Sequence, residues 1–158
     1  GLSRSALPPT REGYAGHPKV ATAAVASSRD RRCSQSVLFV KLWQFTAGDT
    51  APLRLDTRAG EWRQGLVPGL TVLPLHSHDG IDTALVRWAP HTRFQPHTHP
   101  GGEEILVLQG VFSDEWGHYP QGSWLRSPRW SQHAPFTEAE GALILVKVGH
   151  LGATFLAP

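Results

Sequence analysis

The chain has 158 residues, a formal net charge of +2 and a single cysteine, Cys33. This length suits one domain with its own core, one cysteine excludes an intramolecular disulfide, and no apolar run approaches the ~18 residues that a membrane span needs. We therefore expect one cytoplasmic domain without a membrane segment. Basic residues are not clustered in the part predicted to fold, which argues against nucleic-acid binding.

Residues 1–35 carry most of the positive charge. They contain six basic and two acidic residues, a net charge of +4, so the rest of the chain sums to −2. This segment is rich in Ala, Ser, Pro and Arg and poor in large apolar side chains, so it cannot bury enough surface to offset the entropy of ordering. We expect a mostly irregular arm over residues 1–35 and a single domain over residues 36–158.

From residue 36 onward, short apolar runs alternate with turns rich in Gly and Pro, and the Asp79-Gly80 pair predicts a hairpin. No sustained 3.6-residue apolar stripe appears there, and runs about ten residues apart favour a β-sandwich or barrel. Some runs, such as 105–108, are apolar on both faces, which predicts cover by a second layer or another subunit. The predicted strands span residues 37–40, 41–45, 70–75, 83–88, 105–112, 122–126 and 142–148.

The residues with the clearest chemistry lie at 96–110. His97 and His99 are two apart, so on a strand they share one face, and the Pro-Gly-Gly turn after them can return Glu103 toward them. His133 follows a later strand pattern and supplies a third imidazole. Three imidazoles and a carboxylate suit zinc, iron, manganese, nickel or copper better than calcium or magnesium. The spacing predicts one divalent metal per subunit, with exposed strand histidines as the alternative.

This pattern resembles the cupin superfamily, whose fold is a small double-sheet jelly roll. The resemblance covers roughly residues 36–150, and residues 101–115 look like the ChrR-type cupins. Two family motifs, G-x5-H-x-H-x3-E-x6-G and G-x5-P-x-G-x2-H, carry it. The matching residues are His97, His99, Glu103 and Gly110 in the first motif, and Gly122, Pro128 and His133 in the second.

Two positions depart from these motifs. His91 stands at the first glycine of motif one, and Trp130 at the central glycine of motif two. Glycine at such turns supplies positive φ or room for a close backbone approach. We therefore expect that either turn is rebuilt in this chain, while the ligand positions stay intact.

The resemblance implies an all-β cupin double-stranded β-helix whose metal is bound by His97, His99, Glu103 and His133. It also implies that the chain is a dioxygenase-like enzyme, with Fe(II), for a small carbonyl or phenolic compound. The alternative is a non-catalytic, zinc-binding ChrR-like sensor or ligand-binding domain. Iron and zinc are the expected metals, with manganese and nickel as alternatives, and no catalytic residue is assigned.

Glu103 is the ambiguous member of the set, because it either closes a four-ligand shell or stands aside to leave open positions. We expect Glu104 to face solvent or a partner strand, and His76 and His78 to form a solvated strand end. His150 has no set of further metal-ligating residues near it in the sequence. Aromatic side chains near the site in sequence are candidates for a pocket wall. They are Trp88, Phe94, Phe112, Trp124 and Trp130.

The expected partners are a small-molecule ligand or substrate and a second copy of the chain. A homodimer is expected because the arm and the strands that are apolar on both faces leave more apolar surface than one small barrel covers by itself. The resemblance also makes a sigma factor a candidate partner. In related anti-sigma proteins a helical zinc-binding domain holds the sigma factor, and residues 1–35 contain no counterpart of it. We therefore expect no sigma-factor binding by this segment alone.

Overall fold

The computed structural model describes residues 38–42 and 44–152. The arm predicted over residues 1–35 lies outside these residues and stays a prediction. The strands all belong to a compact unit spanning Thr46–Thr154. The described residues of the other unit, 38–42, 44 and 45, form no strand, so the strands predicted there are wrong for these residues. An apolar run becomes a strand only where a neighbouring strand pairs with it.

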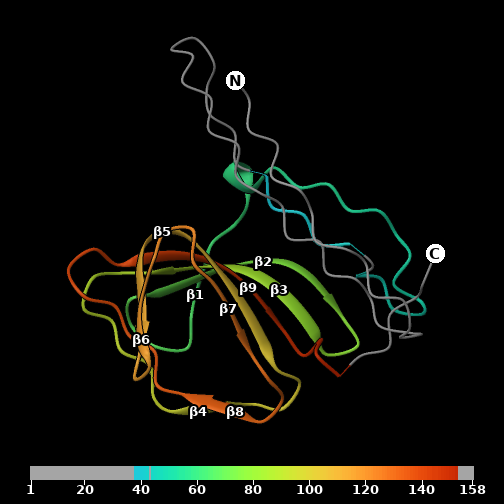
Figure 1. The fold of residues 1–158 in the computed structure, drawn as a ribbon. Coiled ribbons are helices and arrows are strands. Elements are labelled where there is room, and N and C mark those ends of the chain that lie inside the picture. The colour runs from blue at the N-terminus through green and yellow to red at the C-terminus, as the bar shows by residue number, and fades with distance from the viewer. Residues whose placement is uncertain (1–37, 43, 153–158) are drawn as a thin grey trace, which may run out of the picture. The chain divides into compact units, whose positions relative to one another are not determined.

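Most of the strands form one antiparallel sheet in the order β1-β2-β3-β9-β5-β6, and β7 pairs with β5 beside this path. Figure 1 shows this sheet curving around the interior of the unit. A single 3-10 turn, Thr57–Ala59, precedes it. The strands are β1 (Arg63–Gln64), β2 (Leu70–His78), β3 (Ile81–Trp88), β5 (Glu103–Asp114), β6 (Gly117–Pro120), β7 (Trp124–Ser127) and β9 (Ala142–Val148).

Two short strands stand apart from the large sheet. They are β4 (His97–His99) and β8 (Ser131–His133), which pair antiparallel with His97 opposite His133. Figure 1 shows this ribbon facing the concave side of the large sheet. The arrangement brings together two segments more than thirty residues apart and directs them at the same interior.

The core lies on the concave face of the large sheet. Alternate residues point to it, so that Ile105 and Val107 from β5 meet Ile144 from β9, each at most 3% exposed. Trp88 and Phe112 close one end of this core with an edge-to-face contact, their ring centroids 5.4 Å apart. The all-β prediction is therefore confirmed. Among the described residues, no helix is long and apolar enough to cross a membrane.

The turns are formed by residues with positive φ, as the sequence indicates. Asp79 and Gly80 have φ values of 48° and 74° and join β2 to β3, which confirms the hairpin. His91 and Trp130, at the two missing motif glycines, have φ values of 56° and 66°. These turns are not rebuilt: they keep the left-handed backbone although the side chain there is costly.

Candidate metal centre

Three histidines meet between the β4–β8 ribbon and the large sheet. The Nε2 atoms of His99 and His133 lie 3.1 Å apart, and one ring nitrogen from each of His97, His99 and His133 falls within 4.8 Å of the others. The ribbon produces this convergence, because His97 and His133 are directly paired and His99 lies two residues further along the same face.

Glu103 returns to this cluster at the start of β5. Its Oε2 lies 3.4 Å from His99 Nε2 and 3.5 Å from His133 Nε2. The tight turn before it depends on Gly102, which has φ of +74° and where a Cβ atom would come within 2.5 Å of the Leu151 side chain. Oε2 of Glu103 is buried and has no hydrogen-bond partner in the described part of the chain. A buried carboxylate oxygen of this kind is expensive unless it accepts a proton or faces a cation.

The ring nitrogens that face away from the cluster have acceptors of their own. The Nδ1 atom of His97 lies 3.1 Å from the backbone oxygen of Gln95, and that of His133 lies 3.5 Å from Oδ2 of Asp114. Such acceptors fix the tautomer and direct the other nitrogen toward a metal. Sequence spacing does not single out Asp114, because its contact with His133 joins the far end of β5 to β8.

Asp114 is itself firmly held. Its Oδ1 atom accepts hydrogen bonds from the backbone amides of Trp116 and Gly117 and from the hydroxyl of Tyr119, at 2.9 to 3.2 Å. Burial raises the pKa of Tyr119 to about 12, and its hydrogen bond to Asp114 adds to this. The Asp114 carboxylate is therefore preorganised, with Oδ2 left to face His133.

Burial and the charges within the cluster favour the neutral form of His99, His133 and Glu103 when no cation is bound. Burial, followed by the charges of His97 and His133, lowers the pKa of His99 to about 4. Burial and then His97 also lower the pKa of His133. Burial, with the negative charge of Asp114 adding to it, raises the pKa of Glu103 to about 8. Neutral imidazoles are the form that binds metals.

The residues present fit a divalent transition metal. Ligand atoms about 2.0 to 2.2 Å from one ion lie roughly 3 to 3.5 Å from each other, and the separations among His99, His133 and Glu103 match this. The donor set is mostly nitrogen, which favours zinc or iron over calcium or magnesium. A cation would also reverse the cost of ionising Glu103. Assignment of His97, His99, Glu103 and His133 as ligands stays a prediction.

An apolar chamber of about 160 Å³ opens beside the cluster, and we call it the inner chamber. His97, Glu103 and His133 form its polar wall. Three of the five aromatic residues predicted to line a pocket are in its walls. The remaining walls are mostly aliphatic. The aromatic and aliphatic residues are Trp88, Phe94, Phe112, Leu66, Leu70, Val72, Val86, Ile105, Pro135, Ile144 and Val146.

Trp124 and Trp130 are not among the residues that line the inner chamber. Trp124 is 44% exposed, on the outward face of β7, and Trp130 is 67% exposed, in the turn before β8. The Trp130 amide nevertheless donates a hydrogen bond of 2.7 Å to the backbone oxygen of His99. Its turn thus supports the ribbon that carries the histidines through the backbone.

The structure also gives neighbouring residues partners. Glu104 is 6% exposed and pairs with Arg126 of β7, so of the two positions expected for it the partner strand is confirmed and solvent is wrong, and its Oε2 lies 2.8 Å from Nε2 of His150. Arg126 approaches the other oxygen of Glu104 at 3.5 Å. His76 is half-buried at 3.0 Å from Asp49 rather than a solvated strand end. These contacts are long-range and could not be read from local spacing.

Comparison with known proteins points to one family. Residues 50–152 match the family described as the ChrR Cupin-like domain. No curated protein matches the sequence.

Solved structures share the fold at low identity. The complex of Rhodobacter sphaeroides SigE with the anti-sigma ChrR matches at 23% identity and a TM-score of 0.52, over 59% of this chain and 51% of that one. This chain thus spans about half the length of that relative. A Ralstonia eutropha JMP134 protein of unknown function with a cupin-like fold matches at 18% identity (TM-score 0.58; 68% and 76%). A putative acetylacetone dioxygenase from Methylibium petroleiphilum PM1 matches at 17% identity (TM-score 0.57; 68% and 83%). These likenesses confirm the predicted cupin fold.

Proposed function

The chain belongs to the ChrR cupin-like family, and from this premise we propose that it is a dioxygenase-like enzyme with one divalent metal per subunit, acting on a small carbonyl or phenolic compound. The observation that carries the proposal is the apolar inner chamber directly beside three histidines and a carboxylate. A structural metal site needs no such chamber, whereas a site that binds an organic substrate does.

The chamber sets the size and polarity of the proposed substrate. A cavity of about 150 Å³ lined by aliphatic and aromatic side chains is large enough to bind benzene, and the inner chamber has about 160 Å³. It therefore suits a single ring or a short diketone whose polar group faces His97, Glu103 and His133. Aliphatic walls on the opposite side would exclude water from the apolar part of the substrate.

In this proposal His97, His99 and His133 hold the metal, and Asp114 keeps the His133 ring in the tautomer that leaves Nε2 toward it. A bound Fe(II) would supply a Lewis acid and a one-electron donor for dioxygen chemistry. Glu103 is close enough to ligate in the resting state. It would belong to a loosely held shell that a substrate can open.

The test is dioxygen uptake by the 158-residue chain loaded with Fe(II), with acetylacetone and phenol as probe substrates. We expect uptake that matches substrate loss and that is absent in the variant His99→Ala. Uptake no greater than in His99→Ala for a range of small carbonyl and phenolic compounds would contradict the enzymatic proposal. It would leave metal binding, which is measured separately, unaffected.

A second function is favoured by the position of Glu103. Its Oε2 lies within 3.5 Å of two Nε2 atoms, a separation that also suits a closed four-ligand zinc shell. A non-catalytic zinc sensor requires Glu103→Gln to lose metal, since the fourth ligand and its charge are gone. The enzyme requires Glu103→Gln to retain metal on three histidines. Metal content per subunit of this variant separates the two.

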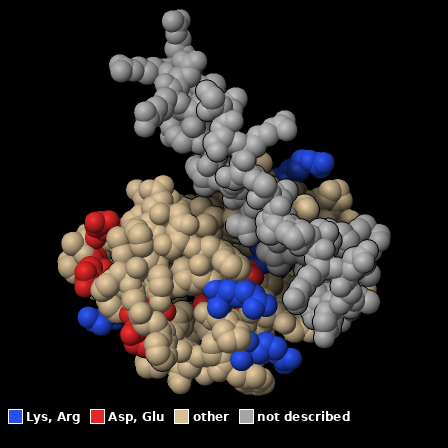
Figure 2. All heavy atoms as spheres, in the orientation of Figure 1, with Lys and Arg blue, Asp and Glu red and all other residues tan. Residues whose placement is uncertain are grey.

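We also propose a cytoplasmic homodimer. Large apolar side chains lie exposed on the described part of the chain, including Leu66 and Trp116 at 88% and 78% exposure, and apolar surface of this kind is often covered by a partner. On the face shown in Figure 2, Lys and Arg side chains stand in separate groups rather than in one basic patch, so nucleic acid is not the proposed partner. A monomer in sedimentation at micromolar concentration would contradict the dimer.

A further inference from the structure

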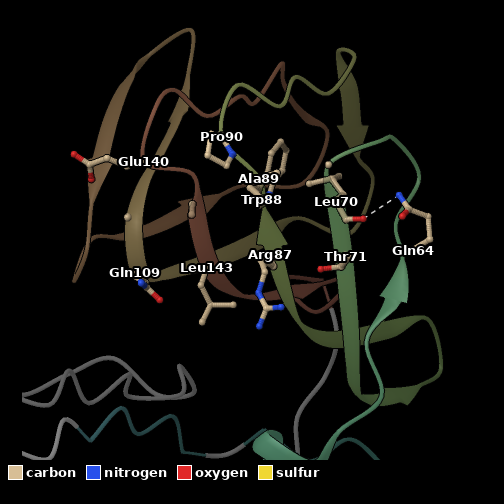
Figure 3. Close-up of a pocket in the computed structure, with 13 residues that line it drawn as sticks. Gln64, Leu70, Thr71, Arg87, Trp88, Ala89, Pro90, Gln109, Glu140 and Leu143 are labelled. Atoms are coloured by element: carbon tan, nitrogen blue, oxygen red, sulfur yellow. Dashed lines mark hydrogen bonds between the residues drawn. The ribbon is translucent and has the colours of Figure 1, made fainter.

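A second cavity, of about 800 Å³, lies outside the inner chamber, and we call it the outer pocket. Val86 and Trp88 of β3 line the inner chamber, and Arg87, between them, points to the opposite face of the sheet and lines the outer pocket. Figure 3 shows this pocket with the residues around it. Its volume is in the range of small-molecule sites in proteins. It is therefore a candidate site separate from the metal centre.

The floor of the outer pocket is a row of four side chains across four adjacent strands. Thr71 on β2 pairs with Arg87 on β3, Arg87 pairs with Leu143 on β9, and Leu143 pairs with Gln109 on β5. Directly paired residues share one face of a sheet. Figure 3 shows Gln109, Leu143 and Arg87 side by side with their side chains running the same way, and Thr71 next to Arg87. Strands lie about 4.8 Å apart, so Arg87 and Gln109 are roughly 10 Å apart.

Arg87 is prepared to bind an anion. Its guanidinium carbon lies 4.2 Å from the centroid of the Trp62 ring, and this stacking holds the planar group in place. No carboxylate of the described residues lies within ion-pair distance of Arg87. Beside it, the Thr71 hydroxyl oxygen is buried and has no hydrogen-bond partner among the described residues. A guanidinium with an adjacent hydroxyl matches the two oxygens of a carboxylate.

The other end of the row has a different chemistry. Leu143 separates Arg87 from Gln109 by an apolar step, and the Gln109 side chain offers an amide. Glu140 also lines the pocket, and Figure 3 shows it on the same side as Gln109. Its negative charge disfavours a second anionic group at that end. A neutral hydrogen-bonding group suits it better.

From this row we infer that the outer pocket binds a small organic carboxylate, with the carboxylate on Arg87 and Thr71, an aliphatic segment over Leu143, and a neutral polar group at Gln109. This site is independent of the metal and of the proposed enzymatic activity. Since Trp88 and Leu70 line both cavities, a ligand in the outer pocket would contact the wall of the inner chamber from its other side.

The test is calorimetric titration of the 158-residue chain at low ionic strength with succinamate, which has a carboxylate at one end and an amide at the other. We expect saturable binding that Arg87→Gln weakens by about tenfold or more, because a charge-assisted hydrogen-bond pair is lost. Thr71→Val, which removes the hydroxyl at nearly constant size, should weaken binding several-fold. Succinate should bind less tightly than succinamate, because of Glu140.

The control is Arg93→Gln, which removes the same charge from another arginine stacked on an aromatic ring, that of Phe136 at 4.9 Å, outside the residues that line the outer pocket. This variant and His99→Ala should bind succinamate as the native protein does. Equal loss in Arg87→Gln and Arg93→Gln would reduce the effect to net charge and overturn the inference. So would binding lost in His99→Ala, tighter binding of inorganic phosphate than of succinamate, or no binding of succinamate at all.

Discussion

Glu103 and Glu104 are adjacent on β5, both are 6% exposed, and yet they lie in opposite kinds of environment. Glu104 faces His150 at 2.8 Å and Arg126 at 3.5 Å, so its charge is matched by protein groups. Glu103 faces His99 and His133, whose pKa values burial lowers, and its Oε2 has no hydrogen-bond partner among the described residues. A buried carboxylate oxygen that lacks a hydrogen-bond partner in the protein indicates a binding site. A buried carboxylate with protein partners indicates a structural role.

The largest loss of stability is expected from removing Glu104, the carboxylate with a structural role. Glu104→Ala should destabilise the fold by about 3 kcal/mol, because removing one member of a buried pair leaves the other uncompensated. Chemical denaturation measures the loss, and metal content per folded subunit should stay at the native level. A Glu104→Ala protein of native stability would show that the buried pair contributes little.

A smaller effect is expected from changing Asp114, which contacts the ring of His133. Asp114→Asn should weaken metal affinity by about tenfold to a hundredfold, because a neutral amide replaces the charged acceptor that fixes the tautomer of the His133 ring. Competition with a chelator of known affinity measures this. Tyr119→Phe, which removes one hydrogen bond to the same carboxylate, should weaken the metal much less and serves as the matched control. Equal effects of the two variants would contradict a role for the Asp114 charge.

The raised pKa of Glu103 predicts that the stability of metal-free protein depends on pH. Its pKa rises from 4.5 when exposed to about 8 when folded, so the unfolded state loses this proton first and the free energy of unfolding falls as pH rises between these values. Glu103→Gln has no proton to lose. Relative to native protein it should gain stability across this range, by roughly 3 to 4 kcal/mol between pH 5 and pH 8, since each unit of pKa shift corresponds to about 1.4 kcal/mol. Denaturation of chelator-treated protein at pH 5 and pH 8 measures the difference, and a constant difference would contradict the raised pKa.

The smallest effects are expected at His91 and Trp130, the two non-glycine residues with positive φ at motif glycine positions. His91 has φ of 56°, is exposed and lies away from the metal-facing histidines, so His91→Gly should stabilise the fold by about 0.5 to 1 kcal/mol. Metal affinity should not change. The turn at Trp130 is bonded to the backbone of His99, so Trp130→Gly provides the comparison nearer the site. A lower thermal midpoint for His91→Gly would show that its side chain does more than occupy a strained position.

Local patterns explain why much of the fold could be predicted. The runs at 70–75, 83–88, 105–112, 122–126 and 142–148 each overlap an observed strand, because alternation and turn residues are local properties. The run at 37–45 forms no strand where it is described, and strand pairing is not a local property that an apolar run reveals. The two-residue β1 and the β6 strand at the Asp114–Gly117 turn were missed because neither has an apolar pattern of its own.

The site could be predicted only as far as sequence spacing reaches. The positions of His97, His99 and Glu103 follow from one strand and one turn, and His133 from a family motif. Asp114, the Glu104–His150 pair and the row from Thr71 to Gln109 depend on which strands are neighbours and in which register. A one-residue change of register would move each of these side chains to the other face, so a single sequence does not determine them.

The proposed function requires above all that His97, His99 and His133 hold a metal. The most direct measurement is metal content per subunit, by elemental analysis, of native protein, His99→Ala and His78→Ala, all purified without added metal. His78 belongs to the other H-x-H pair of the chain and lies outside the cluster, so it is the matched control. If the three histidines hold a metal, we predict about one metal ion per subunit in native protein and in His78→Ala, and almost none in His99→Ala. Full occupancy in His99→Ala, or loss equal to that in His78→Ala, would contradict it.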